Sequence, residues 1–178
     1  EKKEALRQNW YETTKRYKES GLKIELYEIG NEIDQGILGE YSESWDAAWL
    51  KDNIWNKEAQ MLKGAIEGVR QADPNATIVL HIAALSDPDF VYDFFSSMDE
   101  FGVDYDIAGL SFYPTLMDYP PTMATLDDSV QKISNLGKKT LICEFVYPSS
   151  SNDACPLFNK PVEGYPFKPE GQSKYISD

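Results

Sequence analysis

The segment Tyr27-Glu28-Ile29-Gly30-Asn31-Glu32-Ile33 holds the feature that decides how this chain folds. Residues 24–29 are rich in aliphatic and aromatic side chains and predict a β-strand, which Gly30-Asn31 ends in a turn. The turn places Glu32 at the C-terminal tip of the strand. A second predicted strand, residues 140–146, delivers Glu144 in the same way. A pair of carboxylates at strand tips is what an enzyme with two catalytic acids would use.

Helical and strand patterns alternate along the chain. Strands are predicted at residues 24–29, 77–82, 106–113 and 140–146. Each follows a helical pattern: the spacing of Leu6, Trp10, Thr13 and Tyr17; residues 44–72; a helix that starts at Asp87-Pro88; and a short helix opened by a capping box of Thr125 and Asp128. Regular alternation with apolar strands predicts a parallel sheet with right-handed crossovers.

Two parallel architectures are open to such a chain. No Gly-x-Gly-x-x-Gly turn follows any predicted strand, so the dinucleotide-binding form has no support. The other is the α/β class (β/α)8 TIM barrel, in which strand C-termini carry the chemistry. Asn31-Glu32, His81, Tyr113 and Glu144 lie at or near such ends. The barrel reading therefore fits the positions of the polar residues.

The length predicts an incomplete barrel. A whole barrel takes roughly 250 residues, whereas this chain has 178 and four predicted strands. We therefore expect a partial catalytic barrel domain over residues 1–178, comprising about strands 4 to 7 with helices 3 to 6. A long loop after strand 7 is expected at residues 149–170, and loops of that length tend to be functional.

The charge balance limits the possible partners. The chain has 30 acidic and 17 basic residues, a net charge of −13, and no cluster of Lys or Arg. Nucleic acid and an anionic membrane surface are therefore not expected as partners, whereas a neutral polysaccharide is compatible. No apolar run approaches the ~20 residues that span a bilayer, and no signal peptide opens the chain.

The two glutamates suggest glycoside hydrolysis. Hydrolysis with retention of configuration takes two carboxyl groups about 5–5.5 Å apart, and strand tips across a barrel mouth can provide that spacing. Asn31 could hydrogen bond a sugar 2-hydroxyl, and Tyr113 either donates to Glu144 or packs in the barrel rim. His81 is either a donor to substrate or to a catalytic carboxylate, or a buried core imidazole.

Other chemistries find little support in the sequence. With one histidine and no cysteine cluster, no zinc site and no cofactor are expected. Ser111 lacks the glycine pattern of a hydrolase nucleophile. Cys143 and Cys155 form one bridge or none, and a small buried thiol is expected at Cys143. Three tryptophans, Trp45, Trp49 and Trp55, could stack on sugar rings. Their helical spacing, however, favours packing in the core for at least two of them.

These motifs resemble clan A of the glycoside hydrolases, and within it family 53, the endo-β-1,4-galactanases that act on type I arabinogalactan. The fourth-strand motif of that family is similar to residues 30–38, and Gly39 stands where the family has Trp. Residues 78–82 resemble its fifth strand with the histidine, residues 109–114 its sixth, and residues 143–148 its seventh. Residues 169–172 resemble the start of the following helix.

The resemblance implies roles for the strand-tip residues. Glu32 would be the acid/base and Glu144 the nucleophile, while Asn31, His81 and Tyr113 would support catalysis or bind substrate. Some bacterial members bind calcium after the seventh strand, but Asn152 and Asp153 are too few ligands to predict a metal here. The implied substrate, β-1,4-galactan, is too large to enter a cell, so a secreted enzyme is expected, and a monomer when full length.

Two alternatives stay open from the sequence. The first is a clan A glycosidase that acts on another β-linked glycan. The second is a catalytically silent barrel that binds glycan or has a structural role.

Overall fold

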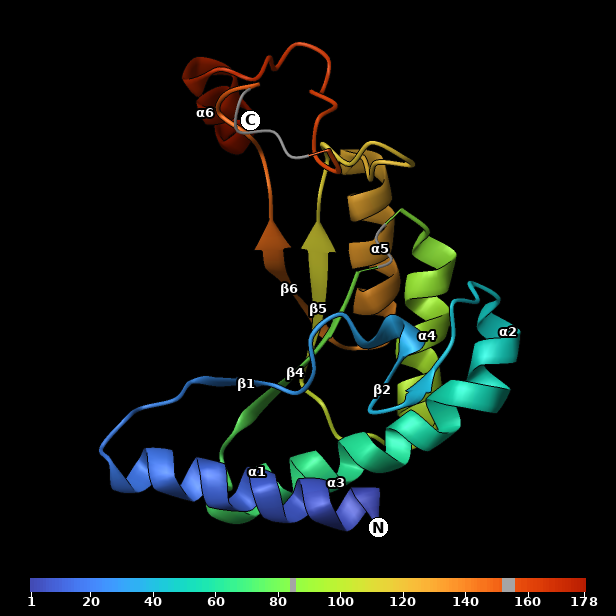
Figure 1. The fold of residues 1–178 in the computed structure, drawn as a ribbon, viewed down its shortest axis with the longest axis vertical. Coiled ribbons are helices and arrows are strands. Elements are labelled where there is room, and N and C mark those ends of the chain that lie inside the picture. Colours follow the sequence, from blue (N-terminus) through green and yellow to red (C-terminus); the bar gives the residue numbers. More distant parts are fainter. Residues whose placement is uncertain (84–85, 152–155) are drawn as a thin grey trace.

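The computed structural model describes residues 1–83, 86–151 and 156–178. Its main sheet has four parallel strands in the order β1 (Leu26–Glu28), β4 (Thr77–Ile82), β5 (Ile107–Phe112) and β6 (Lys139–Phe145). The order in the sheet is the order in the chain, as in a segment of a barrel. Figure 1 shows that the sheet curls, with β1 lying across the lower part of the molecule and β5 and β6 upright.

Helices cover one side of the curled sheet. They are α1 (Lys2–Glu19), α3 (Asn56–Ala72), α4 (Pro88–Glu100) and α5 (Met123–Asn135), whereas α6 (Pro169–Ser177) lies beyond the C-terminal end of β6 at the top of Figure 1. In Figure 1, α1 and α3 lie side by side below the sheet, and α4 and α5 stand together beside β4 and β5. None of the described helices is both long and apolar enough to cross a bilayer.

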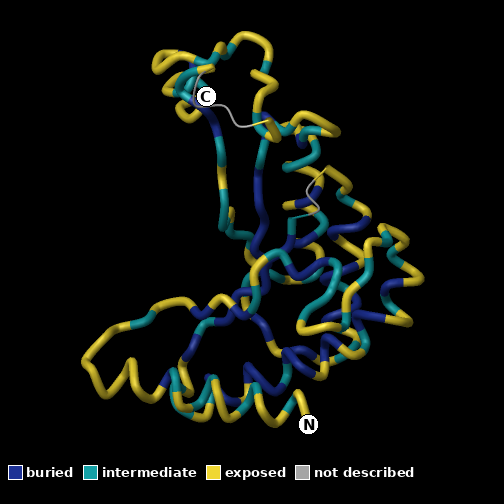
Figure 2. The backbone as a smooth tube through the Cα atoms, viewed as in Figure 1, coloured by how far each residue is buried: buried dark blue, intermediate teal, exposed yellow. Residues whose placement is uncertain are grey.

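The central strands are the buried ones. In β4 and β5 every residue after the first is buried, whereas β1 and β6 are partly exposed, as the tube in Figure 2 shows. Large apolar side chains on these outer strands, Leu26, Ile142 and Phe145, remain exposed. An outer strand lacks a neighbour on one side, so its side chains lack one set of packing partners.

The helical pattern predicted from about residue 44 to residue 72 is helical without a break from Ala47 to Ala72, but it is not one regular α-helix. The structure has α2 (Ala47–Leu50), a π-helical segment (Lys51–Trp55) and then α3. Asp46 caps α2 by accepting a hydrogen bond from the Trp49 backbone at 3.0 Å. The π-helical segment changes the helical phase, so that Trp55 is fully buried and its indole N–H donates to the Asp34 carbonyl at 2.8 Å.

Two further local features of the structure differ from what the sequence predicted. The capping box of α5 is formed by Thr122 and Thr125, not by Thr125 and Asp128, so the helix begins earlier. A threonine hydroxyl serves at the second position where Glu or Gln is usual. The sequence reading also missed a small hairpin, β2 (Gly36–Ile37) and β3 (Glu40–Tyr41). Its two connecting residues both have positive φ, and Gly39, where the family has Trp, is one of them.

Candidate active site

The turn after β1 presents Glu32 in an uncommon backbone conformation. Glu32 has φ 47° and ψ 58°, in the left-handed region of backbone conformation that residues other than glycine rarely adopt. Gly30 has φ 93°, and a Cβ atom there would lie 2.4 Å from Cγ2 of Ile33, so only glycine fits. Ile33 is fully buried and anchors the turn. Strained residues of this kind cluster at functional sites, where the surrounding structure holds them.

A β-bulge in β6 presents Glu144. Leu110 of β5 is aligned with Ile142, but the next residue, Ser111, is aligned with Glu144, so Cys143 is the extra residue on β6. Such bulges re-aim side chains and are common beside active sites. The bulge therefore sets Glu144 directly opposite Ser111, on the strand that also leads to Tyr113.

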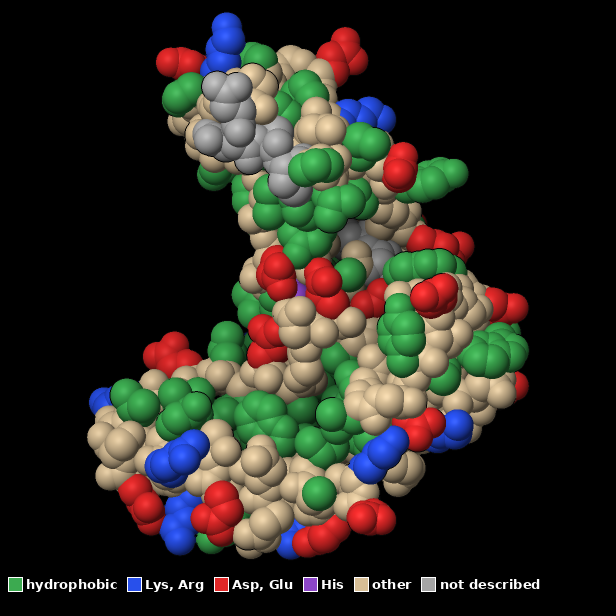
Figure 3. Space-filling model, viewed as in Figure 1, with side chains coloured by type: hydrophobic (Ala, Val, Ile, Leu, Met, Phe, Trp, Pro, Cys, Tyr) green, Lys and Arg blue, Asp and Glu red, His purple; other side chains and the backbone are tan. Residues whose placement is uncertain are grey.

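The two strand-tip glutamates lie close together. A carboxylate oxygen of Glu32, a carboxylate oxygen of Glu144 and a ring nitrogen of His81 all lie within 4.8 Å of one another. Retaining glycosidases need their carboxyl groups about 5–5.5 Å apart, and inverting ones roughly 6.5–9.5 Å. The short approach agrees with the retaining spacing. Figure 3 shows acidic side chains gathered beside the histidine in the hollow of the molecule.

Tyr113 bridges the two glutamates. Its hydroxyl oxygen lies 2.6 Å from Oε2 of Glu144 and 3.1 Å from Oε1 of Glu32. Burial and the hydrogen bond to Glu144 raise the pKa of Tyr113, so the hydroxyl keeps its proton. A short O–H···O⁻ contact is the stronger one, so the proton is donated to Glu144. The sequence left two hypotheses for Tyr113, a hydrogen bond to Glu144 or packing in the barrel rim, and the structure has the hydrogen bond.

His81 reaches Glu32 through a serine and not directly. The imidazole is fully buried, with Nε2 at 2.8 Å from Oγ of Ser111 and Nδ1 at 3.0 Å from Oε1 of Glu28. The Ser111 hydroxyl lies 2.7 Å from Oε1 of Glu32, to which it can donate. Neither Glu28 nor Ser111 was singled out from the sequence as part of the site. A usable signal was present, since Ser111 lies two residues before Tyr113 and so shares its face of the strand.

Two remaining acidic or polar residues complete the surroundings. Asn31 is exposed directly before Glu32, at the mouth of the site. Asp34 is almost fully buried, and its carboxylate accepts a hydrogen bond from the Ala83 backbone at 3.1 Å. Burial raises the pKa of Asp34, and the nearby Glu32 charge adds to this effect. Asp34 is therefore a structural carboxyl group under the site.

Two groups of described side chains have the proximity that a metal ion would need. They are Glu28, His81 and Cys143, and Glu32, His81 and Glu144. Both groups depend on His81, whose two ring nitrogens are already hydrogen bonded. Burial raises the pKa of the Cys143 thiol to about 11, which disfavours the thiolate that binds metals. The described donors therefore fit a hydrogen-bonded network better than a metal site.

Some sequence questions fall on residues that the structure does not describe. Asn152 and Asp153, the two residues considered as calcium ligands, lie in the segment 152–155, outside the described residues. Cys155, the possible disulfide partner of Cys143, lies in the same segment. Cys143 itself is half-buried and forms no disulfide with a described residue.

A cleft of about 590 Å³ opens beside Glu32. Tyr113 and Phe158 form part of its wall, and two well-exposed aromatic side chains, Trp45 and Tyr119, also line it. Glu144 is not among its lining residues. The cleft therefore extends from the Glu32 side of the pair.

The expectation that at least two of three tryptophans pack in the core was wrong. Only Trp55 is buried, while Trp45 is 58% exposed and Trp49 44% exposed. Trp45 precedes α2, so the helical spacing on which the expectation depended does not include it. Its ring packs against Phe90, with ring centroids 5.4 Å apart, and stands at the edge of the cleft.

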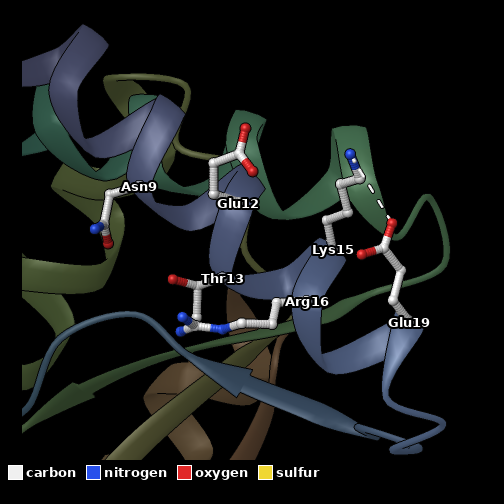
Figure 4. Close-up of a pocket in the computed structure, with 6 residues that line it drawn as sticks. All are labelled: Asn9, Glu12, Thr13, Lys15, Arg16 and Glu19. Atoms are coloured by element: carbon white, nitrogen blue, oxygen red, sulfur yellow. Dashed lines mark ion pairs between the residues drawn. The ribbon is translucent and has the colours of Figure 1, made fainter.

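A second hollow, of about 420 Å³, lies along α1 and is separate from the candidate site. Figure 4 shows that its lining side chains all come from this one helix: Asn9, Glu12, Thr13, Lys15, Arg16 and Glu19. Lys15 and Glu19 form an ion pair at 3.9 Å. This hollow is a polar helix surface and shares no lining residue with the cleft at Glu32.

Comparisons with known sequences point to one family. The family model described as glycosyl hydrolase family 53 matches residues 1–178. An arabinogalactan endo-beta-1,4-galactanase from Humicola insolens is 30% identical over 175 residues, which cover 90% of this chain and 48% of that protein. A probable arabinogalactan endo-beta-1,4-galactanase A from Aspergillus tubingensis is 26% identical, with 90% and 45% covered. The chain spans about half the length of these relatives.

Solved structures show the same architecture. A family 53 catalytic domain from Ignisphaera aggregans has a TM-score of 0.80 and 28% identity, with 99% of this chain and 48% of that chain covered. A fungal beta-1,4-galactanase has a TM-score of 0.79 and 25% identity, with 97% and 52% covered. A Paenibacillus barcinonensis xylanase, with a TM-score of 0.61, 18% identity, and 95% and 48% covered, shares the fold alone. The prediction of a partial (β/α)8 barrel is confirmed.

Proposed function

The chain belongs to glycosyl hydrolase family 53, and on that premise we propose that it is the part of a retaining endo-glycosidase that carries both catalytic glutamates. The proposed substrate is β-1,4-galactan of type I arabinogalactan, because galactanases are among its relatives. The observation that carries the proposal is the close approach of Glu32 and Glu144, which Tyr113 bridges.

In the first step, Glu144 is the nucleophile. One of its carboxylate oxygens attacks the anomeric carbon, while Glu32 gives its proton to the glycosidic oxygen and the bond to the leaving sugar breaks. The hydrogen bond from Tyr113 holds the Glu144 carboxylate in place for the attack. The product of this step is a covalent glycosyl-enzyme.

In the second step, Glu32 is the base. It removes a proton from a water molecule, which attacks the anomeric carbon and releases Glu144. Two inversions at one carbon give net retention. Asn31, exposed directly before Glu32, is proposed to hydrogen bond the sugar 2-hydroxyl, a contact that strengthens in the transition state.

The cleft gives the leaving part of the chain a place to bind. Since it is lined by Glu32 and not by Glu144, it lies on the side of the residue that protonates the leaving sugar. The exposed rings of Trp45 and Tyr119 offer flat apolar faces for sugar rings. Asp87 and Asp118 also line the cleft, and their carboxylates suit neutral sugar hydroxyls and disfavour acidic sugars.

One observation favours a second candidate, a clan A glycosidase with another β-linked glycan as substrate. Gly39 occupies a hairpin turn where the family has a tryptophan, so a usual aromatic contact to sugar is missing at that point. For either substrate we propose secretion, because such polymers are too large to enter a cell intact. We also propose that the full-length enzyme acts as a monomer.

Release of reducing ends by the full-length protein tests the function. The substrates are β-1,4-galactan, mannan, xylan and β-glucan, with the Glu32→Gln/Glu144→Gln double variant as the matched control. Release from galactan alone, absent in the control, is the expected result. Release from a different glycan would identify that glycan as the substrate and would still support the two-glutamate mechanism. A folded protein that releases nothing from any of them would overturn the enzymatic proposal in favour of a binding or structural role.

A further inference from the structure

We propose that Glu28 is a positioning residue for Glu32, acting through His81 and Ser111. In this proposal Glu28 fixes the tautomer of His81, and Ser111 passes the effect to the carboxyl group of Glu32. The inference rests on the proposed function, because it concerns the acid/base of that reaction. None of the roles assigned above includes Glu28.

The four side chains form a continuous chain of hydrogen bonds across three neighbouring strands. Glu28 is on β1, His81 on β4 and Ser111 on β5. The distances are 3.0 Å from Glu28 Oε1 to Nδ1, 2.8 Å from Nε2 to Ser111 Oγ, and 2.7 Å from Oγ to Glu32 Oε1. His81 and Ser111 are buried, so water does not compete for the middle of the chain.

The chemistry of the end groups sets the direction of the first bond. Glu28 is partly exposed, and its carboxylate can only accept a hydrogen bond. Nδ1 of His81 must therefore carry a proton. With Nδ1 fixed as a donor, Nε2 is left as the atom that exchanges a proton with Ser111. This use of a carboxylate to orient a histidine is a general one.

The remaining bonds then have two arrangements with the same number of protons. In the first, Glu32 is the acid: its Oε1–H donates to Ser111, and the Ser111 hydroxyl donates to an unprotonated Nε2. In the second, Glu32 is a carboxylate that accepts from Ser111, and Nε2–H donates to Ser111. The proton on Oε1 moves to Oγ as the hydroxyl proton moves to Nε2, so no proton is taken from or lost to solvent.

Before the first step, these two arrangements compete for the proton that Glu32 must give to the leaving sugar. After that step the hydrogen-bond chain has one proton fewer, and Glu32 is the carboxylate base. The second arrangement makes His81 a cation, and the adjacent charge of Glu28 stabilises it. Glu28 thus balances the two arrangements. The other groups that face this chain are Asp34 in the turn after β1, Tyr113 after β5, and Cys143 and Glu144 on β6.

The tautomer of His81 can be measured directly by nitrogen NMR of the labelled full-length protein. The signals are assigned by their loss in His81→Gln. We expect a proton on Nδ1 in the wild type, and a shift to the tautomer with a proton on Nε2 alone in Glu28→Ala. Glu25→Ala removes an exposed carboxylate just before β1 and should leave the ring unchanged. An unprotonated Nδ1 in the wild type, or a ring that Glu28→Ala does not change, would overturn the proposal.

Kinetics on the glycan that is hydrolysed test the effect on Glu32. Glu28→Ala should lower kcat about tenfold, as loss of an orienting partner commonly does, with KM within about twofold of the wild type. The alkaline limb of the kcat/KM profile should move to lower pH by about one unit. The reason is that the negative charge of Glu28 favours the proton shared by His81, Ser111 and Glu32, and the variant lacks that charge. A merely structural role would leave that limb in place, and an unmoved limb would count against the proposal.

Two precautions keep the test decisive. If Glu28→Ala does not fold, Glu28→Gln fills the same space without the charge and should show the same movement of the alkaline limb. The tautomer measurement needs no turnover. A wild type without activity would therefore count against the proposed function, while a change of His81 tautomer in Glu28→Ala would still support the link between Glu28 and His81.

Discussion

The hydroxyl group of Tyr113 lies 2.6 Å from Oε2 of Glu144, although the two residues come from neighbouring strands and are 31 positions apart in the chain. The tyrosine holds its proton because burial and this bond raise its pKa. A protonated hydroxyl at that distance donates a short hydrogen bond to the carboxyl group of Glu144 and fixes its position. The proposed nucleophile is thus prepared by a residue that follows a different strand.

Substitution of Tyr113 by Phe should lower kcat by about 10- to 100-fold, since it removes a preorganised donor to the proposed nucleophile. KM should change little, because the ring and its contact with Phe158, at a centroid distance of 5.0 Å, remain. Steady-state kinetics on galactan would measure both. Tyr105→Phe, which removes a buried hydroxyl bonded to the Phe95 carbonyl, is the matched control. A similar loss in both variants would contradict the specific role of Tyr113.

Glu144→Gln should lower turnover by about a thousandfold or more, because an amide oxygen does not form the glycosyl-enzyme. Glycan binding should persist, since the amide has nearly the same shape. Reducing-end release and calorimetric titration with galacto-oligosaccharides would measure the two properties. Glu163→Gln, at an exposed loop position, should match the wild type in both. Activity near wild type in Glu144→Gln would exclude it as the nucleophile.

Glu32→Ala should lose activity on galactan but retain much more on aryl glycosides whose leaving group needs no protonation. Added azide should restore turnover and give a β-glycosyl azide, because the small anion takes the place of the activated water and Glu144 still forms the intermediate. Product analysis by NMR would establish the configuration. An equal loss on activated and unactivated substrates would contradict the acid/base role of Glu32.

Trp45→Ala should raise KM for long galactan chains about fivefold, the effect of about 1 kcal/mol of ring contact, and should change kcat little. The reason is that Trp45 lines the cleft beside Glu32 and is 58% exposed. Trp49→Ala is the control, since Trp49 is also exposed but does not line the cleft. Equal KM changes in the two variants would argue against a sugar-binding role for the cleft.

Glu58→Gln should raise the free energy of unfolding at neutral pH by about 1–3 kcal/mol. Glu58 is fully buried on α3, and its carboxylate oxygens have no hydrogen-bond partner among the described residues. Burial raises its pKa, and Asp34 adds to the effect. Because the pKa of Glu58 is higher in the folded protein than in the unfolded one, the protonated carboxyl group stabilises the fold at pH values below the unfolded-state pKa. That stabilisation is lost as the pH rises through the folded-state pKa.

The advantage of Glu58→Gln should therefore grow with rising pH and disappear near pH 4, where the wild-type carboxyl group is protonated in both states. Urea denaturation at several pH values would measure it. Glu67→Gln, on the exposed side of the same helix, should show no such trend. A Glu58→Gln variant less stable than the wild type at neutral pH would mean that Glu58 is paired through residues outside the described part.

The strands were predictable from the sequence because their patterns are local. The strands expected at residues 77–82 and 106–113 lie at or within one residue of β4 and β5. Gly30 likewise indicated the turn before Glu32, since its positive φ is a local property of the backbone. The helix boundaries at Asp46 and Thr122 were misjudged because a polar side chain can cap any of several nearby positions, and packing selects one.

The sequence by itself determined that two glutamates end parallel strands and that the chain forms part of a barrel, because periodicity and turn residues act over a few positions. Only the tertiary structure decided which groups meet them. The bulge at Cys143 sets Ser111 opposite Glu144, and the strand register brings Glu28 to His81. The hydrogen bonds of the site join residues 30 to 81 positions apart. A shift of one residue in strand pairing would turn each side chain to the other face of the sheet.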